Sequence, residues 1–269
     1  MTTETLPATG EKVAAPPLTT YELIDGCGNI VRIPTDLPVE DGVPMESAWH
    51  YQQGHLLLHT LETNWKGRRF YCGANVFIHF SNEKIRNRDF RGPDFYVVLD
   101  VEHGRPRDCW AIFEENGRYP DFILELLSKT TELQDLTTKK DVYEQVFRTP
   151  EYVCYDPREK VIHGWRLVDR YYRPVTLDNS RMWCESLNLW LGPWIGEWNG
   201  INSTWLRFFD KNGRMLPTAG GLEAARADGE QVRANVEQAR ANAAEIDLVR
   251  LRAMLASRTP GSEESNADS

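Results

Sequence analysis

The chain has 269 residues, a formal net charge of −9 at pH 7 and 41% hydrophobic residues. This length suits one medium-sized domain with extensions, or two small domains. The negative charge excludes a protein that coats nucleic acid non-specifically, so any contact with nucleic acid has to be local, through a basic patch or bound metal ions.

The five cysteines are widely spaced and form no Cys-x-x-Cys pair, which argues against a disulfide framework and against a structural zinc site. The N-terminal residues 1–18 lack the apolar core of a signal peptide, and no segment approaches the length of a membrane span. We therefore expect a soluble, cytoplasmic protein.

The N-terminal part of the chain begins with residues 1–20, which are rich in Thr, Pro and Ala and are predicted to be a flexible tail. Residues 21–33 contain an Asp-Gly pair between two apolar runs, which predicts a short β-hairpin. A helix is predicted over about residues 45–65.

The central part alternates strands with one helix, and residues 160–209, rich in Trp and Gly, are predicted to form β-hairpins attached to the core. The helix is expected over about residues 133–147, ended by Pro150. The predicted strands are residues 69–80, 94–101, 109–115, 122–127 and 151–157.

The C-terminal part changes composition at Gly221 to Ala, Glu, Arg and Gln. Apolar residues there step by three or four, as in a coiled-coil seam, namely Val232, Val236, Ala239, Ala243, Ile246 and Val249. We expect one α/β domain over residues 21–218, a helical arm over 219–257 and a disordered tail over 258–269.

Glu125 lies in the middle of the apolar strand 122–127, whose two faces are both hydrophobic, so the strand is predicted to be covered on both sides. A lone buried carboxylate is costly and seldom lacks a partner.

Lys139 lies on the core-facing stripe of the following helix, where it is a candidate partner for Glu125. The expected stripe contains Leu136, Lys139, Val142, Tyr143, Val146 and Phe147.

Asp94 is the third candidate, because it opens a strand directly after Gly92 and Pro93. Two carboxylates can hold a divalent cation such as Mg²⁺, and a nearby ammonium could orient the attacking water. We expect Asp94, Glu125 and Lys139 to converge, with the pKa of Glu125 raised because Asp94 adds a like charge. The alternative for Glu125 is a structural ion pair with Lys139.

The segments "GPDFYVVLDV" and "YPDFILELLSKTTELQDLTTKKDVYEQVFRTPEYVCYDP" resemble the Uma-type family of bacterial restriction endonucleases, within the PD-(D/E)xK superfamily. The similarity extends over roughly residues 21–218. The resemblance implies a mixed β-sheet flanked by helices, in the order α-β-β-β-α-β.

The resemblance also implies site residues. Asp94 matches the Pro-Asp metal ligand and Glu125 the second acidic ligand, whereas Leu127 stands where the superfamily usually has its lysine. The lysine is therefore implied to have moved to the following helix, as Lys139. His50 matches a position where the family often has histidine, and Glu46 could serve as an acid from the first helix.

Other nucleic-acid contacts are weaker candidates. Residues 82–92 could hold a phosphate backbone beside the metal, or form an ordinary solvated loop. The basic residues concerned are Lys84, Arg86, Arg88 and Arg91. Tryptophans 190, 194 and 198 could stack on bases, although packing within a β-hairpin is favoured.

The sequence thus predicts a Mg²⁺- or Mn²⁺-dependent endonuclease acting on DNA. The alternative is a catalytically inactive protein of the same fold that assembles through its C-terminal helix. The partner of this helix could be another copy of the chain or the protein's own core, and a homodimer is favoured.

Overall fold

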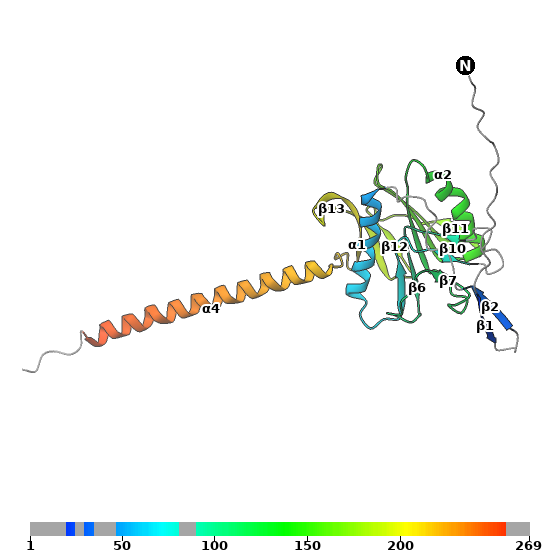
Figure 1. Ribbon diagram of the computed structural model, residues 1–269. Helices are drawn as coiled ribbons and strands as arrows, with labels where there is room; N and C mark the ends of the chain where they lie inside the picture. Colours follow the sequence, from blue (N-terminus) through cyan, green and yellow to red (C-terminus); the bar gives the residue numbers. More distant parts are fainter. Residues whose placement is uncertain (1–19, 25–29, 35–46, 81–89, 257–269) are drawn as a thin grey trace, which may run out of the picture. The chain divides into compact units, whose positions relative to one another are not determined.

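The computed structural model describes residues 20–24, 30–34, 47–80 and 90–256 (Figure 1). The chain divides into two compact units, Met1–Leu216 and Pro217–Ser269. The division into tail, domain, arm and second tail that we expect from the composition stays a prediction. In the described residues no helix is long and apolar enough to cross a membrane.

The first unit is built around a six-stranded sheet in the order β11-β10-β9-β8-β6-β3. Strands β8 and β9 run parallel, whereas the other neighbouring pairs are antiparallel. The sheet is therefore mixed, which confirms the predicted α/β class. Its strands are β3 (Phe70–Gly73), β6 (Phe95–Leu99), β8 (Phe122–Leu126), β9 (Glu151–Asp156), β10 (Val161–Val168) and β11 (Tyr171–Pro174).

Helices accompany both faces of this sheet, because both faces carry apolar side chains. Alternate residues of β8 belong to two hydrophobic clusters, one containing Leu124 and Leu57 of helix α1 (Ala48–Asn64), the other containing Ile123 and Tyr143. The helix of the second cluster consists of α2 (Glu132–Gln134), η2 (Asp135–Lys139), α3 (Lys140–Val142) and η3 (Tyr143–Phe147). The order α-β-β-β-α-β over α1, β3, β6, β8, this helix and β9 is the predicted one.

Smaller sheets complete the unit. The hairpin β1 (Thr20–Ile24) and β2 (Ile30–Pro34) is antiparallel, as predicted. A further sheet has the order β5-β4-β7 and another the order β12-β13-β14. Their strands are β4 (Ile78–His79), β5 (Phe90–Arg91), β7 (Trp110–Ala111), β12 (Met182–Cys184), β13 (Leu189–Trp198) and β14 (Ile201–Phe209).

Two strand predictions were too long. The run 69–80 is divided into β3 and β4, because the chain bends after Gly73, where Asn75 takes a left-handed conformation with φ 55°. A Cβ atom on Gly73 would lie 2.6 Å from the ring of Tyr96, so only glycine allows this close approach. The run 109–115 keeps only β7, because turn hydrogen bonds such as Glu114 N–H to the Ala111 carbonyl (2.9 Å) follow at once.

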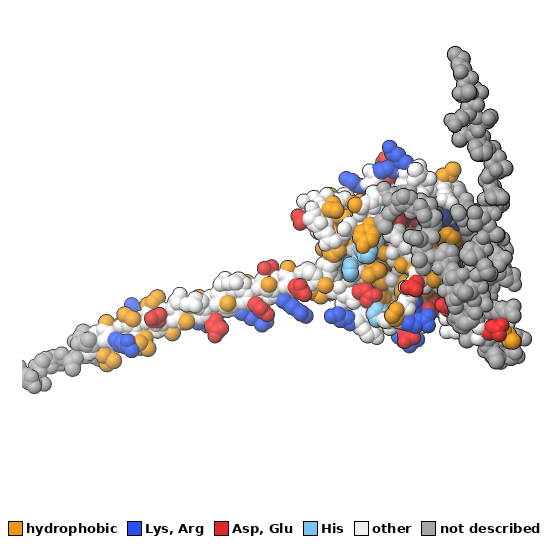
Figure 2. All heavy atoms as spheres, viewed as in Figure 1, with side chains coloured by type: hydrophobic (Ala, Val, Ile, Leu, Met, Phe, Trp, Pro, Cys, Tyr) orange, Lys and Arg blue, Asp and Glu red, His pale blue; other side chains and the backbone are white. Residues whose placement is uncertain are grey.

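The second unit contains helix α4 (Ala219–Ala256). Thr218 caps it, since its side-chain hydroxyl oxygen accepts from the Gly221 N–H at 3.3 Å. Figure 2 shows apolar and charged side chains mixed along this helix. Its large apolar side chains are exposed, among them Val232 (62%) and Ile246 (67%). The predicted helix is confirmed, and a coiled coil stays a prediction.

Candidate active site

The ends of three neighbouring inner strands, β6, β8 and β9, lie side by side in the central sheet. Because β8 and β9 are parallel, both end at the same edge of the sheet, and the antiparallel β6 begins there. Phe95 pairs with Leu124, so the next residues outward, Asp94 and Glu125, stand opposite each other. Opposed residues of an antiparallel pair have side chains on the same face. Asp94 and Glu125 therefore share the face that the 132–147 helix covers.

Hydrogen bonds hold the two carboxylates side by side. The Leu126 N–H donates to Asp94 Oδ2 at 2.7 Å, and the Asp94 N–H donates to Glu125 Oε2 over a long 3.4 Å. Glu125 is 1% exposed, whereas Asp94 is only partly buried. The site thus has a closed side at Glu125 and a more open side at Asp94.

Lys139 reaches the same place from the helix. Its Nζ atom lies 3.2 Å from Glu125 Oε2 and 2.7 Å from Asp135 Oδ1. The Tyr143 hydroxyl donates to the other oxygen of Glu125, Oε1, at 2.8 Å. The structure therefore brings together the three groups that the sequence singles out. We call Asp94, Glu125, Asp135, Lys139 and Tyr143 the carboxylate cluster.

Asp135 is the member that sequence reasoning missed. It is 1% exposed, and its backbone carbonyl accepts from the Tyr152 hydroxyl at 2.8 Å. A usable signal was its spacing, because Asp135 precedes Lys139 by four residues and Tyr143 follows by four more. Residues four apart are neighbours on a helix surface.

The helix that carries these residues is not a regular α-helix. Its segments η2 and η3 have π-type i→i+5 hydrogen bonding, which is rare and is often found at functional sites. The wider turns keep Asp135, Lys139, Tyr143 and Phe147 on the covered face. The predicted stripe was wrong at Val146, which is 47% exposed, because it assumed α-helical geometry.

Burial and charge act against each other in the cluster. Burial raises the pKa of Glu125 to about 8, and the Asp135 and Asp94 carboxylates add to the rise, while the Lys139 ammonium and the Tyr143 hydroxyl oppose it. The rise has the predicted direction. Burial also raises the pKa of Asp94, against the hydrogen bond from Leu126.

Lys139 behaves in the opposite way. Burial alone would lower the pKa of its ammonium, but the neighbouring Glu125 and Asp135 carboxylates outweigh burial and raise it. Lys139 is therefore a fixed positive charge near neutral pH. With three carboxyl groups around one ammonium, the cluster favours an additional cation.

The weaker candidates are placed as follows. His50 on α1 is 9% exposed, its Nδ1 lies 2.8 Å from the Ser47 hydroxyl, and it acts to lower the pKa of Asp94. Arg91 lies in β5, and its charge acts on Tyr143 of the cluster. Glu46, Lys84, Arg86 and Arg88 lie outside the described residues.

Residues 40–192, more than half of the chain, match the Uma2 family, which is described as "Putative restriction endonuclease". The chain belongs to the Uma2 family. The matched range contains the whole carboxylate cluster. The resemblance inferred from the motifs around Asp94 and Glu125 is thereby confirmed.

Among solved structures, one similar chain is described as a putative nuclease belonging to DUF820 from Anabaena variabilis. It is 16% identical, with a TM-score of 0.38, over 62% of this chain and 83% of that chain. No curated protein matches the chain.

The cluster can be tested against the divalent cation that restriction-endonuclease-like families such as Uma2 generally use. Among the described residues no group of three or more His, Cys, Asp or Glu side chains is arranged to hold a metal ion. Mg²⁺, however, is commonly bound by one or two carboxylates together with waters and substrate phosphates. Asp94 and Glu125 fit that pattern, since an ionised carboxylate has about four lone-pair sites and the observed hydrogen bonds do not exhaust them.

Proposed function

We propose that the protein is a Mg²⁺-dependent endonuclease that hydrolyses phosphodiester bonds in DNA, with Mn²⁺ as an alternative ion. The observation that carries this proposal is the convergence of Asp94, Glu125 and Lys139 within a chain of the Uma2 family. A buried surplus of negative charge lowers the stability of the folded protein unless a cation balances it. A bound metal ion would supply that balance.

Each residue has a role in this proposal. Asp94 and Glu125 would hold the metal ion, which supplies polarisation of the phosphoryl oxygen and a bound water of lowered pKa. Lys139 is held by Glu125 and Asp135, and its ammonium would orient the attacking water and stabilise developing negative charge. Asp135 positions Lys139, and Tyr143 positions the Glu125 carboxylate.

Auxiliary roles follow from placement. His50 lies close enough to Asp94 to act on its pKa, and its imidazole could contact a phosphate that arrives there. Glu46 as an acid of the first helix, and contacts from Lys84, Arg86, Arg88 and Arg91 to the phosphate backbone, remain predictions from the sequence. A cytoplasmic location also remains a prediction.

Nicking of supercoiled plasmid DNA in Mg²⁺ or Mn²⁺ tests the proposal. Asp94→Asn and Glu125→Gln keep the side-chain shapes and are expected to abolish nicking. The matched control is Asp121→Asn at the start of the same strand region, where the carboxylate accepts from the Leu99 N–H at 2.7 Å and pairs with Arg118. Equal nicking by wild type and Glu125→Gln would mean that the activity does not come from this site.

A second candidate function is supported by helix α4. Its apolar side chains Val232, Val236, Ile246 and Val249 are exposed by 48% or more, so the helix alone gains little from burial. A coiled-coil homodimer would bury this seam, and an inactive protein could use the same seam for assembly. Charged substitutions on the seam and at other positions of the helix test whether the seam carries the association.

Light scattering on the full chain measures this self-association. Val236→Glu with Ile246→Glu is expected to convert a dimer into a monomer. Ala234→Glu with Ala241→Glu, at the outermost positions of the same heptads, is expected to leave the mass unchanged. A monomeric wild-type chain would exclude the dimer.

A further inference from the structure

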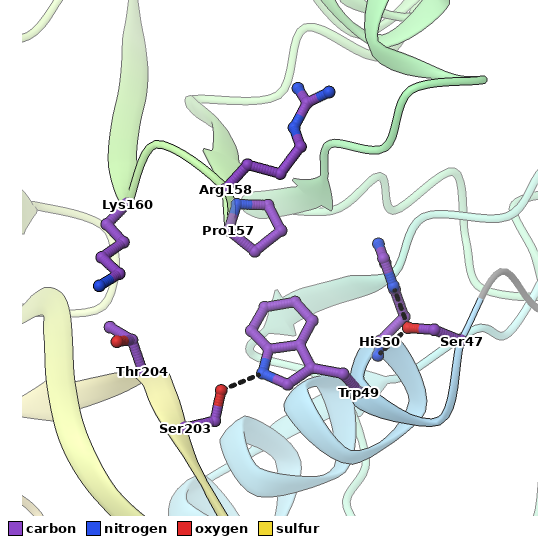
Figure 3. Close-up of a pocket in the computed structure, with 8 residues that line it drawn as sticks. All are labelled: Ser47, Trp49, His50, Pro157, Arg158, Lys160, Ser203 and Thr204. Carbon is purple, nitrogen blue, oxygen red and sulfur yellow. Dashed lines mark hydrogen bonds between the residues drawn. The ribbon is translucent and has the colours of Figure 1, made fainter.

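A cavity of about 290 Å³ lies outside the carboxylate cluster. The start of α1, the turn between β9 and β10, and β14 form its walls (Figure 3). In Figure 3 the Trp49 indole lies on one wall, Pro157 and Arg158 lie on the opposite wall, and Lys160 lies beside Thr204. None of the residues that line the cavity is acidic, although the chain carries a net charge of −9.

Lys160 provides the free positive charge of this cavity. Arg158 is already paired with Asp156 and Glu132, each at 2.6 Å, so its charge is largely balanced. Lys160 forms no ion pair with any residue that the structure describes, and its side chain is exposed. Ser203 and Thr204 add hydroxyl groups on the β14 wall. An ammonium with nearby hydroxyls suits a phosphate group.

Trp49 provides a flat apolar surface next to these polar groups. Its ring stacks on the Trp205 ring with centroids 5.7 Å apart and an angle of 12°, and its Nε1–H donates to the Ser203 hydroxyl at 3.1 Å. These contacts fix the plane of the indole. A held aromatic ring beside a phosphate site offers stacking to a nucleic-acid base.

The cavity and the cluster are next to each other. His50 of α1 lines the cavity. One helical turn further on, α1 touches the Asp94 backbone, because a Cβ on Gly54 would lie 3.0 Å from the Asp94 carbonyl oxygen. Pro157 directly follows β9, which ends at the same sheet edge as β8.

We propose that this cavity binds one nucleotide of the DNA strand whose adjacent phosphate lies at Asp94 and Glu125. Lys160 contacts its phosphate, and its base or sugar lies against Trp49. The proposal rests on the proposed function, because it takes the substrate of the carboxylate cluster to be DNA.

Fluorescence anisotropy with a fluorescein-labelled 20-base-pair DNA duplex in EDTA measures binding without cleavage. Each phosphate contact contributes a slope of about −0.9 to log K against log salt, so Lys160→Ala is expected to weaken binding about eightfold at roughly 0.1 M salt and to reduce the slope by about 1. Lys160→Glu is expected to weaken binding further. Lys66→Ala and Lys66→Glu are the charge-matched controls, because Lys66 lies just beyond the opposite end of α1 and is exposed.

Trp49→Leu tests the stacking surface separately. It is expected to weaken binding about tenfold with an unchanged salt slope, because stacking is not electrostatic. A circular-dichroism melt verifies that this variant folds, and the Lys160 variants decide the proposal if it does not. Deoxythymidine monophosphate as a competitor distinguishes a strand site from a site for free nucleotides.

The outcomes are separable. Equal binding by the Lys160 and Lys66 variants, or full competition by the free nucleotide at the concentration of the duplex, overturns the proposal. A chain that binds the duplex through Lys160 but never cleaves supports the cavity and ends the proposed function. A chain that cleaves through Glu125 but binds independently of Lys160 supports the proposed function and ends the proposal for the cavity.

Discussion

Two buried glutamates on neighbouring parallel strands have opposite surroundings. Glu151 on β9 is 1% exposed, as is Glu125 on β8. Its carboxylate accepts from Arg166 Nη2 at 3.0 Å, from the Glu185 and Ser186 N–H groups at 2.9 and 3.0 Å, and from the Ser186 hydroxyl. Donors thus surround Glu151.

Glu125 has other carboxylates beside it, one of which shares its positive partner. It shares the Lys139 ammonium with Asp135, and Asp94 stands opposite it. The Glu151 environment stabilises an ionised carboxylate within the fold, whereas the Glu125 environment penalises one until a further cation arrives. Burial alone therefore does not distinguish Glu151 from Glu125, for which we propose metal binding, and the balance of donors and acceptors around each carboxylate does.

The largest expected effect follows from removing the Lys139 ammonium, which Glu125 and Asp135 share. Lys139→Met leaves Glu125 and Asp135 buried without a positive partner, which is expected to lower the free energy of unfolding by about 3–5 kcal/mol. Urea denaturation in EDTA measures it, and the loss should be greater at pH 9 than at pH 6, because Glu125 is ionised at the higher pH. Lys129→Met, at an exposed position just after β8, is the control. Equal losses for the two variants would mean that the cluster does not depend on Lys139.

The two glutamates themselves should differ by a smaller amount. Glu151→Gln weakens several charge-assisted hydrogen bonds and is expected to cost about 2–3 kcal/mol. Glu125→Gln removes a carboxyl group that has to take up a proton on folding at pH 7, so this variant is expected to gain stability at pH 7 rather than lose it. Thermal and urea unfolding of both variants in EDTA compare them. A greater loss for Glu125→Gln would reverse our account of the two environments.

The pH dependence of stability sharpens the same comparison. The pKa of Glu125 is about 8 in the folded protein against an ordinary 4.5, so between these values the folded state binds a proton that the unfolded state has released. Glu125 therefore supports folding at low pH and loses this contribution as the pH rises towards 8. The slope should differ between wild type and Glu125→Gln by up to about 1.4 kcal/mol per pH unit. Identical pH profiles in EDTA would contradict the raised pKa.

The smallest expected effect concerns a single hydroxyl. Tyr143→Phe removes the bond to Glu125 Oε1 and is expected to cost about 1 kcal/mol, and more at pH 9 than at pH 6, because the acceptor becomes charged. Tyr172→Phe is the matched control, since its hydroxyl donates at 3.0 Å to the neutral Thr149 carbonyl. Its loss should not vary between these pH values.

Much of the fold could be predicted because local patterns and the tertiary structure agree. The apolar runs at 122–127 and 151–157 form central strands, as expected for sequences covered on both faces. The run at 69–80 was predicted as one strand, but the structure divides it after Gly73. The packing of Tyr96 against Gly73 joins residues that are far apart in the sequence. No local pattern contains that contact.

The candidate site shows the same limit. Asp94, Glu125 and Lys139 were identifiable, because each is a charged residue in an apolar context or in a family motif. Val146 was misplaced because the sequence gives no sign of π-type bonding, whereas Asp135 was missed although its four-residue spacing from Lys139 was visible in the sequence. An assumed α-helical period assigns the wrong face to residues beyond each wide turn.

The π-type turns also make the arrangement of the carboxylate cluster depend on the length of this helix. A turn with i→i+5 bonding holds one more residue than an α-helical turn, so segment η2 has the register of a helix that has gained a residue. Deleting the exposed Thr138 would return that turn to α-helical spacing and shorten the separation of Asp135 and Lys139 from four residues to three. Such a protein would retain every charged group of the cluster and still lose its arrangement. The arrangement of the cluster therefore depends on the number of residues between Glu125 and Lys139 as well as on their identities.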